Sequence, residues 1–155
     1  MRLRLIALLT ILIMGGCSTT GDYAITGIGS VDGDAAITVG KVVSDTAEVG
    51  VTGVFYAIED EHYTPAVGVY AAYLVPLPDE IQEDWQPFAG GALAMETEDF
   101  GLIPKMFAGL IYKPTDVVSP LYMVERAWPS DDISTPDIAS RGNDIYHWFG
   151  LRYRF

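Results

Sequence analysis

The sequence predicts an all-β protein that folds as an eight-stranded antiparallel up-and-down β-barrel. Eight segments are rich in Val, Ile, Tyr, Phe and Thr, residues that favour strands. Turn-type pieces such as "VDGD", "SDT" and "KPTD" separate these segments. Half of the 155 residues are hydrophobic, yet beyond the N-terminal run no apolar stretch is long enough for a membrane helix, and none shows a convincing helical period.

The expected strands cover most of the chain after residue 22. They are Tyr23–Ser30, Ala35–Val43, Ala47–Ile58, Thr64–Val75, Trp85–Glu96, Phe100–Lys113, Val118–Trp128 and Asp144–Phe155. Successive side chains of a strand point to opposite faces of its sheet, so each strand has two faces. In lipid every backbone polar group needs an internal partner, so an all-strand chain that spans a membrane must close into a barrel.

The N-terminal residues predict export and a lipid anchor. Residues 1–16 have a basic start, an apolar run too short to span a bilayer, and two small residues before Cys17, which is the only cysteine. "IMGGC" resembles the lipobox of bacterial lipoproteins, in which the cysteine is acylated and becomes the new N-terminus. The resemblance implies a cleaved signal peptide at 1–16, a lipidated tether at 17–22 and one barrel domain at 23–155. Ser18 after the cysteine implies sorting to the outer membrane.

The segment "FGLRYRF" at 149–155 has a membrane-type alternation. Its apolar positions are Phe149, Leu151, Tyr153 and Phe155, and Gly150, Arg152 and Arg154 alternate with them. This pattern resembles the assembly signal of Gram-negative outer-membrane β-barrels, which the barrel-insertion machinery reads. The chain is similar to the small, eight-stranded OmpA/OmpW-like class of that group. The resemblance implies that the apolar residues face lipid, and that aromatic residues near strand ends form interface girdles (Tyr23, Tyr56, Tyr63, Trp85, Tyr112, Trp128, Tyr153 and Phe155).

The same alternation places charges inside the barrel. If Leu151 and Tyr153 face lipid, Arg152 and Arg154 point into the lumen. Buried charges need partners. We therefore expect a lumen charge network formed by Arg152, Arg154, Lys105, Glu48, Glu96 and Glu125. Such a network forms either a gated polar pathway or a plug; eight strands make a narrow lumen, which favours the plug.

Charge and motifs limit the partners. Removing residues 1–16 changes the formal net charge from −12 to −14, which argues against binding nucleic acid. Acidic residues gather in the connections, among them Asp32, Asp34, Glu98 and Asp99. They form either a solvated rim or a cation-mediated contact with lipopolysaccharide. The long connection at 129–143 is the expected surface for any protein partner.

The sequence argues against an enzyme and predicts no cofactor or metal. The only histidines are His62 and His147, and no nucleotide loop, zinc constellation or nucleophile elbow is present. The small barrel enzymes that modify lipid A depend on histidine with serine and a carboxylate, and the His-x-Ser pairing of the deacylase family is missing. Three hypotheses follow: a non-enzymatic outer-membrane barrel lipoprotein with an envelope or surface-interaction role, a soluble lipid-tethered carrier of a small apolar ligand that is similar to lipocalins, and a lipid A-modifying enzyme.

Overall fold

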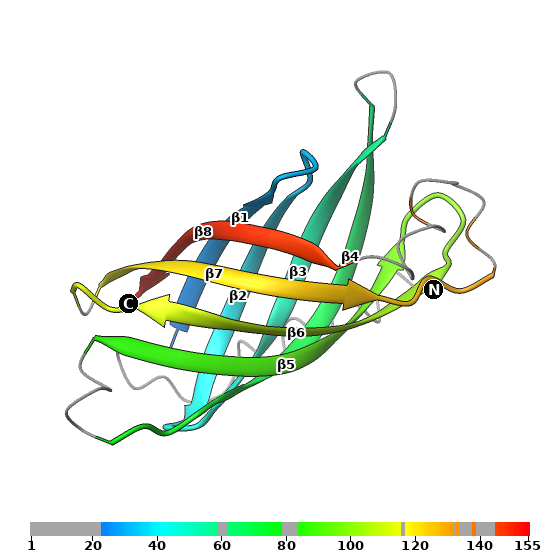
Figure 1. Cartoon of the computed structure of the whole chain (residues 1–155). Coiled ribbons are helices and arrows are strands. Elements are labelled where there is room, and N and C mark those ends of the chain that lie inside the picture. The colour runs from blue at the N-terminus through cyan, green and yellow to red at the C-terminus, as the bar shows by residue number, and fades with distance from the viewer. Residues whose placement is uncertain are drawn as a thin grey trace.

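The protein forms a closed antiparallel barrel in which each strand pairs with its neighbours in the chain (Figure 1). The computed structural model describes residues 23–58, 62–78, 84–115, 117–131, 133, 138 and 145–155. The strands are β1 (Tyr23–Ser30), β2 (Ala35–Ser44), β3 (Ala47–Ile58), β4 (His62–Leu74), β5 (Trp85–Glu96), β6 (Leu102–Tyr112), β7 (Val118–Ala127) and β8 (Tyr146–Arg154). The predicted fold class is confirmed, and every predicted strand lies within a few residues of an observed one.

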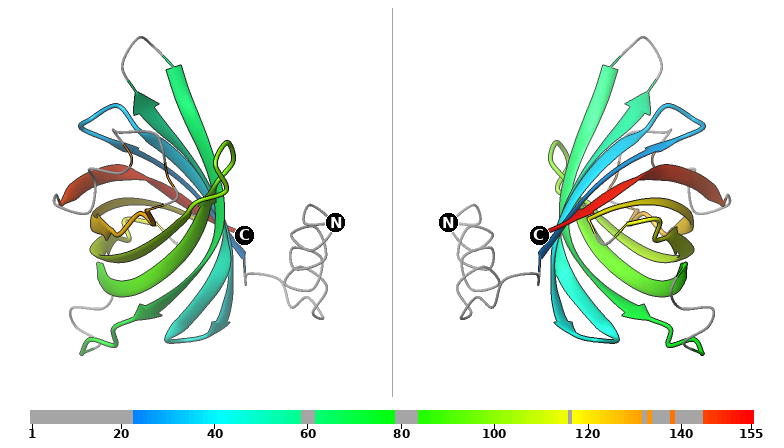
Figure 2. Two further views of the ribbon diagram at one scale, coloured as in Figure 1. Left: turned by 90° about the vertical axis from the view of Figure 1, so that its right-hand side faces the viewer. Right: turned by 90° about the vertical axis from the view of Figure 1, so that its left-hand side faces the viewer.

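The seam between β1 and β8 closes the barrel. Its register runs from the pair Ala24–Arg154 to the pair Ser30–Trp148. Two further backbone hydrogen bonds join Tyr23 to Phe155 at 3.2 and 3.0 Å. The two side views show β8 lying against β1, with no open edge between them (Figure 2). All eight strands therefore have both edges paired, which removes the unpaired N–H and C=O groups that an open sheet would leave.

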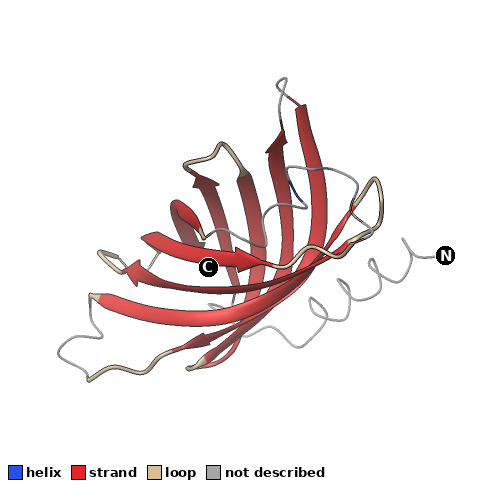
Figure 3. Ribbon diagram, turned by 45° about the vertical axis from the view of Figure 1, so that its right-hand side comes forward, coloured by secondary structure: helices blue, strands red, loops and turns tan. Residues whose placement is uncertain are grey.

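The strands are tilted relative to the barrel axis, and their connections lie at the two ends of the barrel (Figure 3). We call the end with the β1–β2, β3–β4, β5–β6 and β7–β8 connections the loop end. The opposite end, where Tyr23 and Phe155 lie, is the terminal end. The described ends of β3 and β4, strands of 12 and 13 residues, extend beyond the neighbouring β1–β2 turn at the loop end (Figures 1 and 2).

The inside of the barrel is the hydrophobic core. Its buried side chains come from β2 to β8 and from two residues of the β7–β8 connection; they include Val54, Phe88, Ile103, Ile111, Leu121, Met123, Ile133, Ile138 and Trp148. Glycines alternate with the large side chains. A Cβ on Gly90 would lie 2.7 Å from the Phe107 ring, and one on Gly109 would lie 2.7 Å from the Phe88 ring. Because Gly90 pairs with Phe107 and Gly109 with Phe88, two rings fit side by side in a narrow lumen.

Two buried carboxylates, one expected in the acidic rim and one in the lumen network, have structural roles at the loop end. Asp34 is buried and accepts the backbone N–H of Ala57 at 2.8 Å, which ties the β1–β2 turn to β3. Glu96 is fully buried and accepts the backbone N–H groups of Glu98 and Asp99, both at 2.6 Å. These carboxylates stabilise turns, so the acidic rim is smaller than the sequence suggested.

The described part of the β7–β8 connection folds over the barrel mouth. Beyond the end of the β6–β7 ladder the Ser130 N–H donates to the Leu102 carbonyl oxygen at 2.8 Å, and Ser130 Oγ accepts the Leu102 N–H at 3.0 Å. Ile133 and Ile138 are then buried in the core. A Cβ on Gly101 would lie 2.2 Å from Ile133 Cγ1, so glycine at that position makes room for the isoleucine.

Candidate functional site: the barrel lumen

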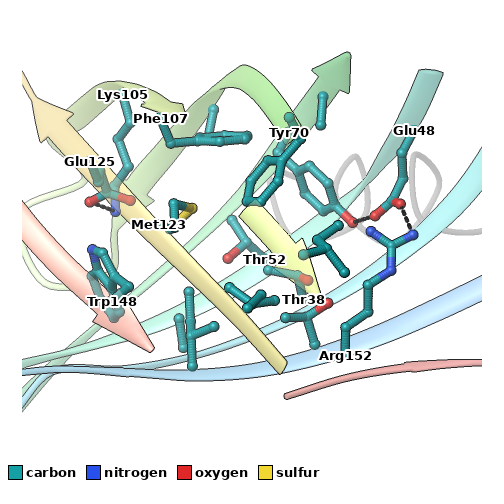
Figure 4. A pocket seen from close by; sticks show the side chains of 18 of the residues that line it. Thr38, Glu48, Thr52, Tyr70, Lys105, Phe107, Met123, Glu125, Trp148 and Arg152 are labelled. Carbon is teal, nitrogen blue, oxygen red and sulfur yellow. Dashed lines mark hydrogen bonds and ion pairs between the residues drawn. The ribbon is translucent and has the colours of Figure 1, made fainter. Parts of the chain in front are cut away.

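Two ion pairs of the lumen lie in separate clusters on opposite sides of an internal pocket (Figure 4). Each inward-facing position comes from the period-two alternation of one strand. The cavity between the clusters has a volume of about 80 Å³. Its walls are mostly apolar, and they include Ile28, Val54, Phe107, Leu121, Met123 and Trp148.

The first cluster joins β3, β4 and β8. Arg152 Nη2 forms an ion pair with Glu48 Oε2, and the Tyr70 hydroxyl donates a hydrogen bond of 2.6 Å to Glu48 Oε1. Both oxygens of the Glu48 carboxylate are thus bonded, and its side chain is only 4% exposed. The Arg152 side chain is 12% exposed. Because both of its oxygens have partners, the Glu48 carboxylate can be buried among the packed side chains of the lumen.

Two glycines make room for this cluster. Gly40 and Gly50 pair with each other across β2 and β3. A Cβ on Gly40 would lie 2.1 Å from the Tyr70 hydroxyl oxygen and 2.5 Å from Glu48 Oε1, and a Cβ on Gly50 would lie 2.6 Å from the Tyr70 ring. Any larger residue at either position would displace the tyrosine from the carboxylate or move the backbone.

The second cluster joins β6 and β7. Lys105 Nζ lies 2.9 Å from Glu125 Oε1, with side-chain exposures of 2% and 8%. The ammonium group also lies over the Tyr56 ring, 5.0 Å from its centroid. An ammonium ion above an aromatic face is attracted by the negative face of the ring. The lysine is therefore stabilised by a carboxylate and by an aromatic ring.

The six residues expected in the lumen charge network divide into two ion pairs and two residues that lie apart from them. Arg152 lies with Glu48, and Lys105 lies with Glu125. Glu96 is bonded to the β5–β6 turn, as described above. Arg154, at the end of β8, is exposed and lies outside the residues that line the cavity. Four of the six expected residues therefore pair inside the lumen, whereas Arg154 does not point into it and Glu96 bonds a turn instead of a cation.

The outer surface carries the outward-facing apolar side chains of the strands, which we call the apolar rows. The proposed assembly-signal residues Phe149, Leu151, Tyr153 and Phe155 are all exposed, at 48–57%. Outward-facing Val67 and Leu110 on β4 and β6 are exposed as well. The β8 strand thus presents apolar side chains outward and points Arg152 into the lumen.

Aromatic residues lie on the outside near both ends of the strands. Tyr63 and Trp128 are exposed near the loop end, and Trp85, Tyr112, Tyr153 and Phe155 are exposed near the terminal end. Tyr23 stacks on Phe155 with ring centroids 6.2 Å apart. One expected girdle residue was wrong. Tyr56 is fully buried, because it sits at an inward position of β3 and contributes its ring to the Lys105 cluster.

His147 also lies on the outer surface. Its ring nitrogen Nδ1 lies 2.7 Å from the Tyr122 hydroxyl, and the two rings stack with centroids 6.1 Å apart. A cross-strand pair of this kind gives a hydrogen-bond partner to each of two polar groups on the outer surface. The His62 side chain, Cys17 with the rest of residues 1–22, and most of the 129–143 connection lie outside the described residues.

Two lumen residues were missed by the sequence reasoning. Tyr70 bonds Glu48, and Trp148 is 1% exposed and lines the cavity. Both lie at inward positions of expected strands, so alternation could have placed them inside; nothing in the sequence showed which side chains each would contact. Within the described ranges no group of three or more His, Cys, Asp or Glu side chains could hold a metal. No helix of the described part is long and apolar enough to cross a membrane.

The comparisons with known proteins define the class of fold. A designed transmembrane β-barrel matches with a TM-score of 0.61 and 11% identity, over 89% of this chain and 98% of that one. The N-terminal barrel domain of Pseudomonas aeruginosa OprF matches with a TM-score of 0.62 and 13% identity, over 86% and 96%. Neisserial surface protein A matches with a TM-score of 0.52 and 16% identity, over 87% and 94%.

The sequence itself has no match among protein-family models, and no curated protein matches it. The structural likeness shows the fold alone. The chain is an all-β, eight-stranded antiparallel barrel whose structural neighbours are transmembrane β-barrels, two of them from outer membranes.

Proposed function

We propose that the protein is a non-enzymatic β-barrel lipoprotein of the Gram-negative outer membrane, with a structural or surface-interaction role in the envelope. The observation that carries the proposal is the distribution of side chains on β8 and its neighbours. Leu151 and Phe155 face outward and are more than half exposed, whereas Arg152 is inside and paired. A water-soluble barrel would place such a charge outside and such residues inside.

A structural role fits a lumen whose walls are mostly apolar. The buried pairs Arg152–Glu48 and Lys105–Glu125 are separated by apolar walls, and Ile133 and Ile138 cover the core at the loop end. Such an interior supports a plug rather than a conducting channel. The outward apolar rows weigh against the soluble lipocalin-like carrier. The exposed position of His147, bonded to Tyr122, lends no support to a lipid A-modifying enzyme.

The lipid anchor belongs to the same proposal. Acylation of Cys17 would attach residues 17–22 to the membrane next to Tyr23, where β1 begins at the terminal end. A single acyl chain binds membranes only marginally, so the barrel and the anchor would reinforce each other. The implied partners are outer-membrane lipid or lipopolysaccharide, the lipoprotein-sorting machinery, and the barrel-insertion machinery acting on Phe149, Leu151, Tyr153 and Phe155. Residues 129–143 are the proposed surface for a further protein partner.

Membrane insertion can be tested on the protein extracted from membranes in detergent. We expect unboiled protein to migrate differently from boiled protein on a denaturing gel. We also expect refolded protein to float with phospholipid vesicles through a density gradient and to resist extraction by carbonate. Protein that stays monomeric and soluble without detergent, and remains at the bottom of the gradient, would contradict membrane insertion.

Lipidation can be tested separately. A Cys17→Ala variant should lose the acyl mass seen by mass spectrometry and should retain its signal segment, because the lipoprotein peptidase requires the modified cysteine. Ser18→Ala is the matched control and should keep the acyl mass. An identical mass for wild type and Cys17→Ala would remove the lipoprotein part of the proposal and leave the barrel part standing.

A further inference from the structure

The lumen contains space that the side chains do not fill. Inward-facing Ala72 and Ala92 are only partly buried although they point away from the outer surface, because the cavity of about 80 Å³ lies beside them. The two ion-pair clusters lie on opposite sides of this space (Figure 4). Eight-stranded barrels are just wide enough to hold one small ligand when their side chains leave room.

One residue of the cavity lining carries a buried polar group without a hydrogen-bond partner among the described residues. The indole Nε1 of Trp148 is buried and makes no hydrogen bond within the described part of the protein. Trp148 lines the cavity together with Met123 and Phe107. An indole nitrogen can only donate a hydrogen bond, and burying a donor without an acceptor is unfavourable. The site therefore lacks an acceptor atom.

The walls define the chemistry of a molecule that could bind in this space. Most of the lining is aliphatic or aromatic, so a bound molecule must be apolar over most of its surface. The cationic groups of Lys105 and Arg152 are already paired with carboxylates, which disfavours a charged ligand. An ordered internal water needs two to four polar partners, and Thr26, Thr38 and Thr52 also line the space, so water is the competing occupant.

We propose that the barrel interior is a binding site for a small neutral molecule with an apolar body and one oxygen acceptor, such as a short ketone. The acceptor oxygen receives the hydrogen bond from Trp148 Nε1, and the apolar body contacts Met123 and Phe107. The cavity volume is roughly half that of the 150 Å³ engineered cavity that binds benzene. The ligand class is thus limited to a few heavy atoms, and the flexible thioether of Met123 can adjust to small differences in shape.

The test uses the indole N–H signals of the full chain in detergent micelles, observed by ¹⁵N-resolved NMR. The protein has three tryptophans, and Trp85 and Trp128 are exposed on the outside, so they report partitioning of a ligand into the micelle. A Trp148→Phe variant assigns the third signal. Acetone and isobutene are the two ligands, because they have the same shape and only acetone has an acceptor.

We expect acetone to shift the Trp148 indole proton downfield and saturably, while the other two signals move only linearly. Isobutene should compete with acetone without causing a downfield shift. Ala92→Leu fills the cavity and should abolish the saturable shift. Ala89→Leu, on the outer face of the same strand, is the matched control and should retain it.

Folding of each variant is checked by the gel shift on heating, and Ala72→Leu replaces Ala92→Leu if that variant does not fold. The proposal is overturned if the Trp148 signal does not saturate, or if saturation persists in the folded cavity-filling variant. It is also overturned if magnetisation transfer from long-lived internal water shows that water occupies the space beside the Trp148 N–H.

Discussion

Replacing Arg152 with methionine should destabilise the barrel strongly, because it leaves the Glu48 carboxylate buried without its cation. Glu48 and Arg152 have side-chain exposures of only 4% and 12%. Removing one partner of such a pair typically costs about 3–5 kcal/mol of unfolding free energy. The Tyr70 hydroxyl still donates its 2.6 Å hydrogen bond to Glu48, so we expect a value near the lower limit, about 3 kcal/mol.

The double variant Glu48→Gln/Arg152→Met separates a charge effect from a packing effect. It removes both charges while keeping an acceptor for Tyr70, and should lose only about 1 kcal/mol. The assay is urea unfolding in phospholipid vesicles, followed by tryptophan fluorescence and by the gel shift. With a slope of about 2 kcal/mol per molar urea, the single variant should shift the midpoint by about 1.5 M.

Arg154→Met is the matched control on the same strand. Arg154 is exposed, so its replacement should change the stability by less than about 0.5 kcal/mol. The reasoning fails if the double variant is less stable than Arg152→Met. In that case the arginine contributes through packing of its aliphatic chain, and the ion pair contributes little.

Three further substitutions probe the lumen, the outer surface and the loop end. Gly40→Ala should cost about 1–3 kcal/mol in the same unfolding assay, because the new methyl group would lie 2.1 Å from the Tyr70 oxygen. Gly53→Ala, whose Cβ meets open space, should be neutral. Equal effects of the two substitutions would contradict the steric argument. Leu151→Arg should lower insertion into vesicles and cost about 2–4 kcal/mol of unfolding free energy if the residue lies near the middle of the bilayer. Asp131→Arg, at an exposed position, should be tolerated. Normal flotation of the Leu151 variant would place this face outside the lipid. Ile133→Ala should cost at least about 2 kcal/mol of unfolding free energy, because the side chain is buried. Val31→Ala, at a position 70% exposed, should cost little. Comparable unfolding midpoints for the two variants would show that the β7–β8 connection does not pack on the core.

The strands and their faces were predictable because period-two alternation is a local signal. Leu110 in "AGLIYK" and Leu151 in "FGLRYR" both follow a glycine and come two residues before a tyrosine. They belong to two strands of the same direction, and both face outward. The alternation also placed Arg152 and Lys105 inside. These features follow from the backbone geometry of a strand, so neighbouring residues suffice to predict them.

The pairing of the charges could not be predicted from local patterns. Glu48 and Arg152 are 104 residues apart, and they meet because of the strand tilt and stagger around the barrel. Glu96 is also an inward carboxylate, yet it lies one position before a turn and accepts turn N–H groups. Tyr56 shows the same limit, since its place near a strand end suggested an interface residue although its face is the inner one.

The seam between β1 and β8 has a consequence for how the barrel is made. Seven of its eight strand pairings join chain neighbours, and only the β1–β8 pairing requires ends more than a hundred residues apart to meet. Until they meet, the sheet is open, and β1 and β8 are edge strands with unpaired backbone N–H and C=O groups. Its closure competes with pairing between different molecules, so refolding yield should fall as the concentration of chains rises.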